Sequence, residues 1–180
     1  KWVDENTLRF NNQNDIIVID IKNKSLLQYI KLAERVENID YCEQNKMCAY
    51  TIGNNLSIIN ENGEIKQVSN DRNHDIIYGQ TVARNEFGID KGTFWSPKGN
   101  FLAFYRKDES MVTNYPIIKT DKRIAEVNHI KYCMAGMKSE EVKLGIYDVA
   151  NEKINYINTG EPAEQYLTNI AWSPDEKSIY

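Results

Sequence analysis

The sequence predicts an all-β chain arranged as a partial β-propeller, with about three four-stranded blades and the start of a fourth. Two observations lead to this prediction. Short runs of β-branched and aromatic residues recur between clusters of Asn, Gly, Asp and Lys, which is the pattern of strands joined by tight turns. In addition, one aromatic-turn-strand motif returns along the chain. The clearest strand-like runs cover residues 16–21, 47–52, 56–59, 101–105 and 144–149.

The repeated motif consists of an aromatic residue, a tight turn and an apolar strand. It is clearest where Trp95-Ser96-Pro97-Lys98-Gly99-Asn100 precedes residues 101–104, and it begins again with Trp172-Ser173-Pro174. Weaker copies start at Tyr41 and Trp2, so that successive starts lie 39, 54 and 77 residues apart. Because propeller blades recur at roughly 40–50 residues, the two longer spacings predict blades that carry inserted loops.

We expect blade-like units at about 1–34, 35–69, 93–160 and 166–180, with an inserted arm at 70–92. In such a unit Pro and Gly set the turn, the aromatic ring packs between neighbouring sheets, and the next strand is apolar because adjacent blades cover both of its faces. The arm is polar, but Ile76, Ile77 and Phe87 predict that it is ordered. A β-sandwich with accidentally similar hairpins is the alternative fold.

Composition and charge argue against several kinds of protein. The chain has 180 residues and a formal net charge of −4, with a pI of about 5.3. A nucleic-acid-binding protein normally carries a basic face, so no nucleic-acid partner is expected. No apolar run approaches the roughly 18 residues that suggest a membrane-spanning helix. The chain begins without Met and stops within an expected strand, so we expect a piece of a longer protein.

Metal, cofactor and catalytic motifs are not found in the sequence. The three cysteines and two histidines are too few and too scattered for a disulfide framework or a zinc site, so no metal and no cofactor is expected. Cys42 and Cys48 flank a predicted turn and could pair, but small buried hydrophobic residues are the preferred interpretation. The sequence has no G-x-S-x-G, P-loop, G-x-G-x-x-G or H-E-x-x-H motif. These residues alone therefore do not build a hydrolytic site.

Several segments in fixed order resemble the N-terminal β-propeller domain of the dipeptidyl peptidase IV family. They are Asp75-Ile76-Ile77-Tyr78-Gly79, Arg84-Asn85-Glu86-Phe87-Gly88-Ile89 and the stretch from Gly92 through Trp95-Ser96-Pro97 to Tyr105. Lys107-Asp108-Glu109-Ser110, Tyr115-Pro116 and the stretches 131–138 and 142–147 continue the likeness. Bacterial members that cleave after proline, including prolyl tripeptidyl peptidases, look most similar. The likeness is dense from about Ile39 to Tyr180 and thin over residues 1–38.

The resemblance implies a serine exopeptidase with an eight-bladed propeller and a C-terminal α/β-hydrolase domain in the same chain. The Ser-Asp-His triad of such an enzyme lies in the hydrolase domain, so this stretch alone should be inactive. The resemblance also implies an extracytoplasmic location, either periplasmic or at the cell surface. A homodimer that uses propeller extensions is common in the family.

An acidic arm of the propeller binds the free amino terminus of the substrate in this family, through two adjacent glutamates in dipeptidyl peptidases. Glu86 fits the second of these positions, whereas Asn85 stands where the first glutamate would be. Strict dipeptidyl specificity is therefore not implied. Arg84 could position Glu86 or bind a substrate carbonyl, and Asn85 could donate to a carbonyl. The expected substrate-binding residues are Glu86, Asn85 and Arg84, and no catalytic residue is expected in this stretch.

Three functions remain to be distinguished at the level of sequence. The first is a substrate-gating propeller that recognises peptide N-termini for a peptidase releasing di- or tripeptides after proline. The second is a non-catalytic propeller that serves as a protein-interaction module, since propellers are reused widely. The third is a periplasmic propeller of the TolB type, which would lack the Arg84-Asn85-Glu86-Phe87 arm.

Overall fold

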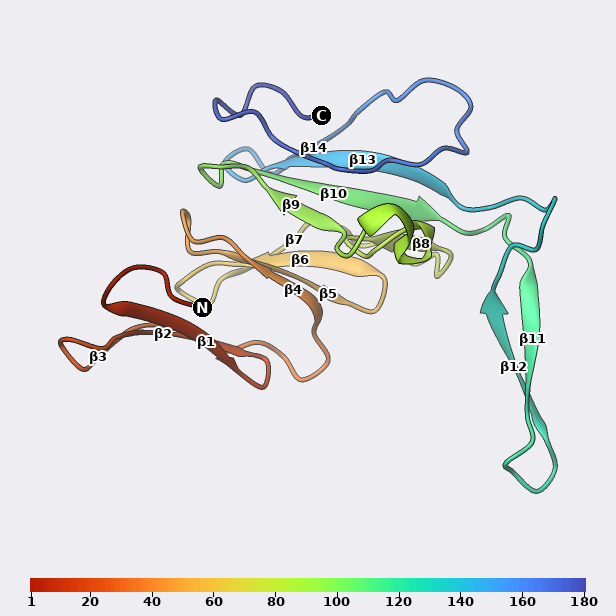
Figure 1. The fold of residues 1–180 in the computed structure, drawn as a ribbon, viewed down its shortest axis with the longest axis horizontal. Helices are drawn as coiled ribbons and strands as arrows, with labels where there is room; N and C mark the ends of the chain where they lie inside the picture. The colour runs from red at the N-terminus through yellow and green to blue at the C-terminus, as the bar shows by residue number, and fades with distance from the viewer.

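Fourteen strands and one short 3-10 helix form the regular structure of the chain, for which a computed structural model describes residues 1–180 (Figure 1). The fold is all-β and matches a partial β-propeller, as predicted. No helix has the length and apolar character needed to cross a membrane. The elements are β1 (Thr7–Asn12), β2 (Asp15–Asp20), β3 (Ser25–Ile30), β4 (Glu37–Tyr41), β5 (Cys48–Ile52), β6 (Asn55–Ile59), β7 (Ile65–Gln67), β8 (Ile76–Tyr78), η1 (Ala83–Gly88), β9 (Thr93–Trp95), β10 (Phe101–Asp108), β11 (Asn114–Lys119), β12 (Glu126–Lys131), β13 (Glu141–Asp148) and β14 (Lys153–Tyr156).

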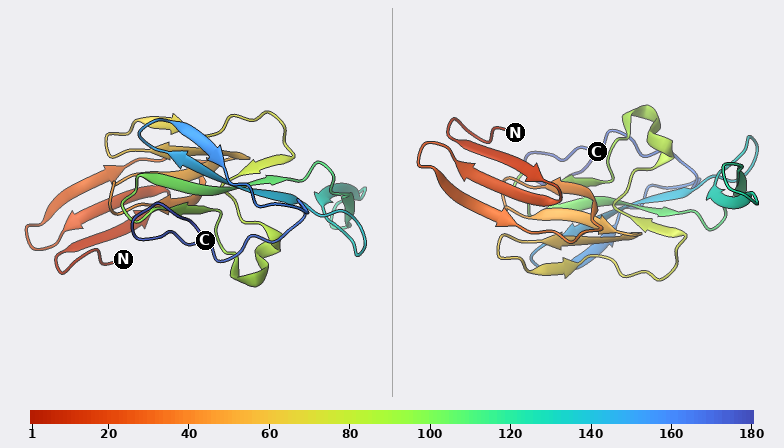
Figure 2. Two further views of the ribbon diagram at one scale, coloured as in Figure 1. Left: turned by 90° about the horizontal axis from the view of Figure 1, so that it is seen from above. Right: turned by 90° about the horizontal axis from the view of Figure 1, so that it is seen from below.

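Three antiparallel sheets follow one another along the chain, and a separate hairpin extends from the third (Figures 1 and 2). The first sheet has the order β1-β2-β3, the second β4-β5-β6-β7 and the third β14-β13-β10-β8. One edge of β10 pairs with β13 along its whole length. The other edge pairs with β9 near its start and with β8 near its end, where Arg106 lies opposite Tyr78. Because β8 lies within residues 70–92, part of the predicted arm belongs to the third sheet.

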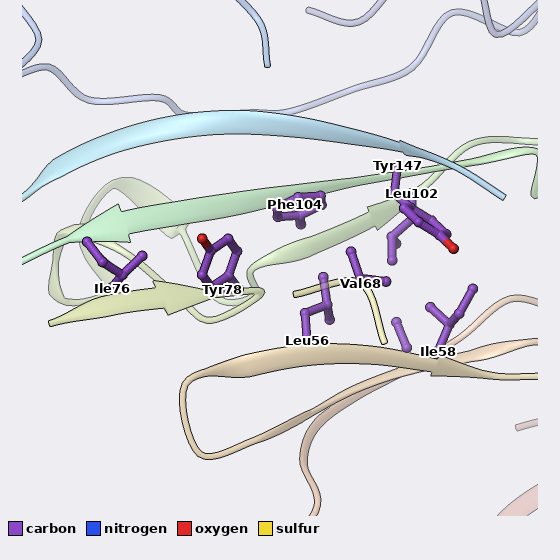
Figure 3. Packing of buried hydrophobic residues seen from close by; sticks show 9 residues of the cluster. Leu56, Ile58, Val68, Ile76, Tyr78, Leu102, Phe104 and Tyr147 are labelled. Carbon is purple, nitrogen blue, oxygen red and sulfur yellow. The ribbon is translucent and has the colours of Figure 1, made fainter. Parts of the chain in front are cut away.

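The central strands bury both of their faces, which explains their continuous apolar sequence. In β10, Leu102 and Phe104 point toward the second sheet, whereas Ala103 and Tyr105 point to the opposite side. All four residues are at most 1% exposed. Figure 3 shows Leu102 and Phe104 facing Leu56 and other residues of the second sheet. The sheets therefore act as walls for one another, as blades of a propeller do.

The repeated aromatic motif has the same register in three of its four copies. Each aromatic residue pairs with the start of the following strand: Tyr41 lies opposite Cys48, Trp95 opposite Leu102, and Trp172 opposite Ile179. Trp2 forms the corresponding bridge to Leu8. The repeat predicted from sequence is thus confirmed. The first sheet has three strands rather than four, because its Trp2 segment is reduced to this single bridge.

Hydrogen bonds from the motif join each sheet to the preceding one. The indole N–H of Trp95 donates to the backbone oxygen of Asp40 in β4 at 3.0 Å. The indole N–H of Trp172 donates to the backbone oxygen of Phe94 in β9 at 3.0 Å. Asp40 directly precedes Tyr41 and Phe94 directly precedes Trp95, so the acceptor occupies the same place in both copies. The predicted packing of the rings between sheets therefore includes a specific polar contact.

The turns of the motif also contact one another. Glu176, in the turn that follows Trp172, is 8% exposed. Its carboxylate accepts from the backbone N–H of Lys98 at 2.6 Å and from the side-chain amide of Asn100 at 2.7 Å. The turn that follows Trp95 is also bound by the preceding copy of the motif, since the side-chain amide of Asn45 donates to the backbone oxygen of Gly99 at 2.6 Å. Three successive turns are therefore linked at one end of the sheets.

The cysteines and the long insertion complete the fold. Cys42 and Cys48 are buried free thiols, and burial raises the pKa of Cys48 to about 12, so these two behave as small buried residues. Cys133 is also free but only half-buried. The β11–β12 hairpin extends away from the sheets (Figure 1), and nearly all of its strand residues are exposed.

Candidate functional site

The segment η1 projects from the stacked sheets between β8 and β9 (Figure 2). Its two flanking residues are buried: Val82 is 2% exposed and Ile89 is 5% exposed. Both pack against the face of the third sheet that points away from the second sheet. Between them, residues 84–88 are exposed. The sequence thus fixes both ends of the loop by apolar burial and leaves its polar middle accessible.

The backbone of η1 is strained. Ala83, Arg84 and Asn85 have φ values of 50°, 52° and 62°, and Phe87 follows at 55°. The left-handed region costs roughly 1–2 kcal/mol per residue other than glycine, although Asn tolerates it better. Glu86 interrupts this run with an extended conformation, at φ −67° and ψ 162°. Such conformations persist only where surrounding contacts hold them, and they cluster at functional sites.

A cavity of about 310 Å³ lies beside η1. Its walls come from η1, from the segment before and at the start of β13, and from the segment that follows β14. Arg84 and Glu86 line it, whereas Asn85 does not. The full lining is Val82, Ala83, Arg84, Glu86, Cys133, Ser139, Glu140, Val142, Glu164, Gln165, Tyr166 and Leu167.

Three contacts hold η1 against its surroundings. The backbone N–H of Ala83 donates to Oε1 of Glu140 at 2.6 Å. The guanidinium of Arg84 lies over the ring of Tyr132, 4.1 Å from its centroid. The ring of Phe87 meets that of Tyr166 edge-on, with centroids 4.8 Å apart. Phe87 is nevertheless 63% exposed, so it is a surface contact of the arm rather than a core residue.

The cavity carries more negative than positive charge. Glu86, Glu140 and Glu164 line it together with a single guanidinium, that of Arg84. Both the hydroxyl and the backbone N–H of Ser139 donate to Oε1 of Glu164, at 2.6 and 3.2 Å. These bonds lower the pKa of the Glu164 carboxyl below its ordinary value. Glu164 is therefore ionised at neutral pH, and the arrangement suits a cationic group with donor hydrogens.

Two acidic residues at the end of β10, Asp108 and Glu109, have local partners instead. Glu109 pairs with Lys107 at 2.6 Å. Asp108 accepts from the backbone N–H of Ser110 at 2.9 Å, closing a turn after β10. Neither residue lines the cavity.

Sequence reasoning did not identify Glu140, Glu164, Tyr132 or Tyr166 as part of this site. Glu140 is 57 residues from its partner Ala83. The pairing of β10 with β13 brings the start of β13 back toward the arm, since Asp108 lies opposite Glu141. The available signal in the sequence was the pair Glu140-Glu141 at the start of an apolar strand. Such a pair is too common to indicate a binding site.

Comparison with known proteins identifies the family. The family model described as "Dipeptidyl peptidase IV (DPP IV) N-terminal region" matches residues 3–180. Dipeptidyl-aminopeptidase B of Talaromyces marneffei is 27% identical over 164 residues, which cover 81% of this chain and 18% of that protein. The solved structure of a dipeptidyl aminopeptidase IV from Bacteroides ovatus is 50% identical, with a TM-score of 0.88, over 99% of this chain and 24% of that one.

A second solved structure shares the fold at lower identity. Dipeptidyl peptidase 4 of Porphyromonas gingivalis gives a TM-score of 0.76 at 24% identity, over 99% of this chain and 26% of that one. The chain thus spans about a fifth to a quarter of the length of these relatives. The chain belongs to the dipeptidyl peptidase IV family, and it forms part of the family's N-terminal β-propeller region.

Proposed function

We propose that the full-length protein is a serine exopeptidase that releases di- or tripeptides after proline from peptide N-termini. In this proposal the propeller restricts access to the catalytic centre, and η1 recognises the amino terminus of the substrate. The names of the relatives, all dipeptidyl aminopeptidases or peptidases, support the class of reaction. The partner of the propeller is the C-terminal α/β-hydrolase domain of the same chain, which supplies the Ser-Asp-His triad.

One observation carries the proposed role of this region: Glu86 stands on a strained, projecting loop at the edge of an acidic cavity. A peptide amino terminus is largely protonated near pH 7 and offers several N–H donors. A carboxylate held in a fixed place can bind it through short charge-assisted hydrogen bonds. This binding sets the distance between the first residue and the nucleophile, so it determines how many residues are released.

The remaining parts of the proposal concern the whole protein. Arg84 lines the cavity with Glu86 and stacks on Tyr132, so its contribution is to fix the arm. Asn85 lies outside the lining and is exposed, so it is a weaker candidate for contact with substrate. An extracytoplasmic location and a homodimer, both known in the family, are part of the same proposal. Neither a metal nor a cofactor takes part in it.

The test is a Glu86→Gln variant of the full-length protein. We would compare Xaa-Pro and Xaa-Xaa-Pro amide substrates, each with a free and with an acetylated amino terminus. A hydrogen bond to a charged group contributes roughly 1.5–3 kcal/mol, so the variant should lose at least about tenfold in kcat/KM on the free-amino substrates and little on the acetylated ones. The matched control is Glu5→Gln, an exposed glutamate on the first blade. Equal kinetics for Glu86→Gln and wild type would remove Glu86 from the site.

The two substrate series also decide the specificity. Faster cleavage of Xaa-Pro amides would indicate a dipeptidyl enzyme, and faster cleavage of Xaa-Xaa-Pro amides would indicate a tripeptidyl enzyme. If neither series is cleaved, the alternative function as a non-catalytic interaction module is the better one.

A further inference from the structure

Ala83, at the start of the exposed loop η1, donates its backbone N–H to a side-chain carboxylate from another part of the chain. Its partner is Oε1 of Glu140, at a distance of 2.6 Å. Glu140 directly precedes β13, an eight-residue strand that pairs with β10 along its whole length. Val142, two residues further on, is 5% exposed in the core. The acceptor is therefore attached to a strand that is fully paired and whose next inward residue is buried.

The donor stands at the point where the strain of η1 begins. Ala83 is the first of three consecutive residues in the left-handed region, and Glu86 is the next residue after them. The side chains of Asn85 and Glu86 make no hydrogen bond within the chain that could hold the loop. Backbone bonds from Asn85 to Val82 and from Ile89 to Glu86 close the turn on itself but do not attach it to the sheet. The bond from Ala83 to Glu140 does attach it.

We propose that Glu140 is a positioning residue for substrate binding. Its carboxylate fixes the left-handed turn so that the Glu86 carboxylate, three residues beyond Ala83, faces the ammonium group of the substrate. This inference rests on the proposed function of Glu86 and adds a second residue to it. Glu140 acts through the backbone of the arm and does not itself bind the ammonium.

The competing role for Glu140 is direct binding of the same cation, because it also lines the cavity. The two roles differ in what they require from the side chain. Positioning requires an oxygen that accepts from the Ala83 N–H, which the amide oxygen of Gln supplies as well as a carboxylate does. Direct binding of a cation requires the negative charge, which Gln lacks.

The experiment uses the full-length protein with the substitutions Glu140→Ala, Glu140→Gln, Glu86→Gln and the double change Glu86→Gln with Glu140→Ala. The quantity measured is the ratio of kcat/KM for a free-amino peptide amide to that for its acetylated counterpart. A general loss of folded enzyme lowers both rates equally and leaves this ratio unchanged, whereas a misplaced Glu86 lowers the ratio. Thermal unfolding of each variant is recorded beside the kinetics.

We expect Glu140→Ala to lower the ratio at least about threefold, and Glu140→Gln to keep it within about twofold of wild type. In the Glu86→Gln background, Glu140→Ala should change the ratio less than about twofold, because the group that it positions is already neutral. A loss in Glu140→Gln as large as in Glu140→Ala would overturn the positioning role in favour of direct binding.

Two further outcomes separate this inference from the proposed function. If Glu86→Gln lowers the ratio and Glu140→Ala leaves it unchanged, the positioning role is wrong and the proposed role of Glu86 stands. If Glu86→Gln leaves the ratio unchanged, both are wrong, whatever Glu140→Ala does, because Glu140 would then have no Glu86 function to act through.

Discussion

The indole N–H of Trp172 donates to the backbone oxygen of Phe94, which belongs to the preceding blade. The indole ring also stacks on Phe101 of that blade, with the ring centroids 5.9 Å apart and the planes at 19°. Trp95 makes the equivalent hydrogen bond to Asp40, one blade earlier. In these two copies the Trp therefore makes a polar contact between blades, which an apolar residue without an N–H could not make.

Replacing Trp172 by Phe should destabilise the propeller. Phe keeps an aromatic ring against Phe101 but removes the donor to the half-buried Phe94 carbonyl, and a typical hydrogen bond contributes about 0.5–1.5 kcal/mol. Denaturant unfolding of the full-length variant, monitored by a spectroscopic signal from the propeller, should show a lower midpoint than that of wild type. The control is Trp2→Phe, because Trp2 is 60% exposed and its indole N–H makes no hydrogen bond. Equal midpoints for Trp172→Phe and wild type would contradict the structural role.

Glu176 should make the contact between the third and fourth blades sensitive to acid. Burial by itself would raise the pKa of this carboxyl, but donation from Ser96, the Lys98 N–H and the Asn100 amide outweighs it and holds the pKa below the ordinary 4.5. A lowered pKa in the folded state means that the ionised form stabilises the fold. This stabilisation is fully present above about pH 4.5 and is lost as the pH falls through the lower folded-state value.

The measurement is the melting temperature of wild type and Glu176→Gln as a function of pH. The variant should be less stable at pH 7 and should lose less stability than wild type on acidification below about pH 4.5. Glu5→Gln serves as the control for removing one exposed carboxylate. Parallel curves for Glu176→Gln and wild type would show that the carboxylate is not coupled to folding.

Gly145 should tolerate no side chain, because it lies in β13 directly opposite Phe104. A Cβ atom built at this position would approach Cζ of the Phe104 ring to 2.5 Å. Gly145→Ala should therefore cost about 1–3 kcal/mol through overpacking. Measured by denaturant midpoint, the double variant Gly145→Ala with Phe104→Leu should be less impaired than the sum of the two single changes. Simple additivity would exclude this contact as the cause.

The stacking of Arg84 on Tyr132 should contribute to substrate binding through the arm. Exposed cation–π contacts are worth about 0.5–1 kcal/mol, so Tyr132→Leu should lower kcat/KM for free-amino substrates roughly two- to fivefold. Tyr132→Phe, which keeps the aromatic ring, should recover most of the loss. Combining Tyr132→Leu with Arg84→Met should add little to either change. Full additivity of the two losses would mean that Arg84 acts independently of Tyr132.

Much of the fold could be predicted from the sequence because it is built from local, repeated signals. The Trp-Ser-Pro turns at Trp95 and Trp172 appear in the structure with the same register. Strand β8 could not be predicted in this way, because three residues carry no usable periodicity and only the pairing of Ile76–Tyr78 with β10 makes them a strand. Of the three apolar residues expected to order the arm, Ile76 and Ile77 are buried, whereas Phe87 is exposed and meets only the ring of Tyr166. Val82 and Ile89 are the residues that bury the ends of η1.

The candidate site was only partly accessible to sequence reasoning. Arg84 and Glu86 come from one short segment that resembles the family, and both line the cavity. Glu140 and Glu164 reach the same cavity from distant parts of the chain, and nothing in their local sequence distinguishes them from solvated glutamates. Such contacts depend on how β13 and the segment after β14 return past the arm.

The bonds from Trp95 and Trp172 constrain only the first strand of each repeat, and the connections between later strands are not bound by them. The β11–β12 hairpin emerges from such a connection, between β10 and β13, and η1 lies in the connection that leads from β8 into β9. Changes in the length or sequence of these two excursions therefore leave the Trp hydrogen bonds between the sheets in place. Substrate preference can diverge in this architecture without a matching change in the scaffold.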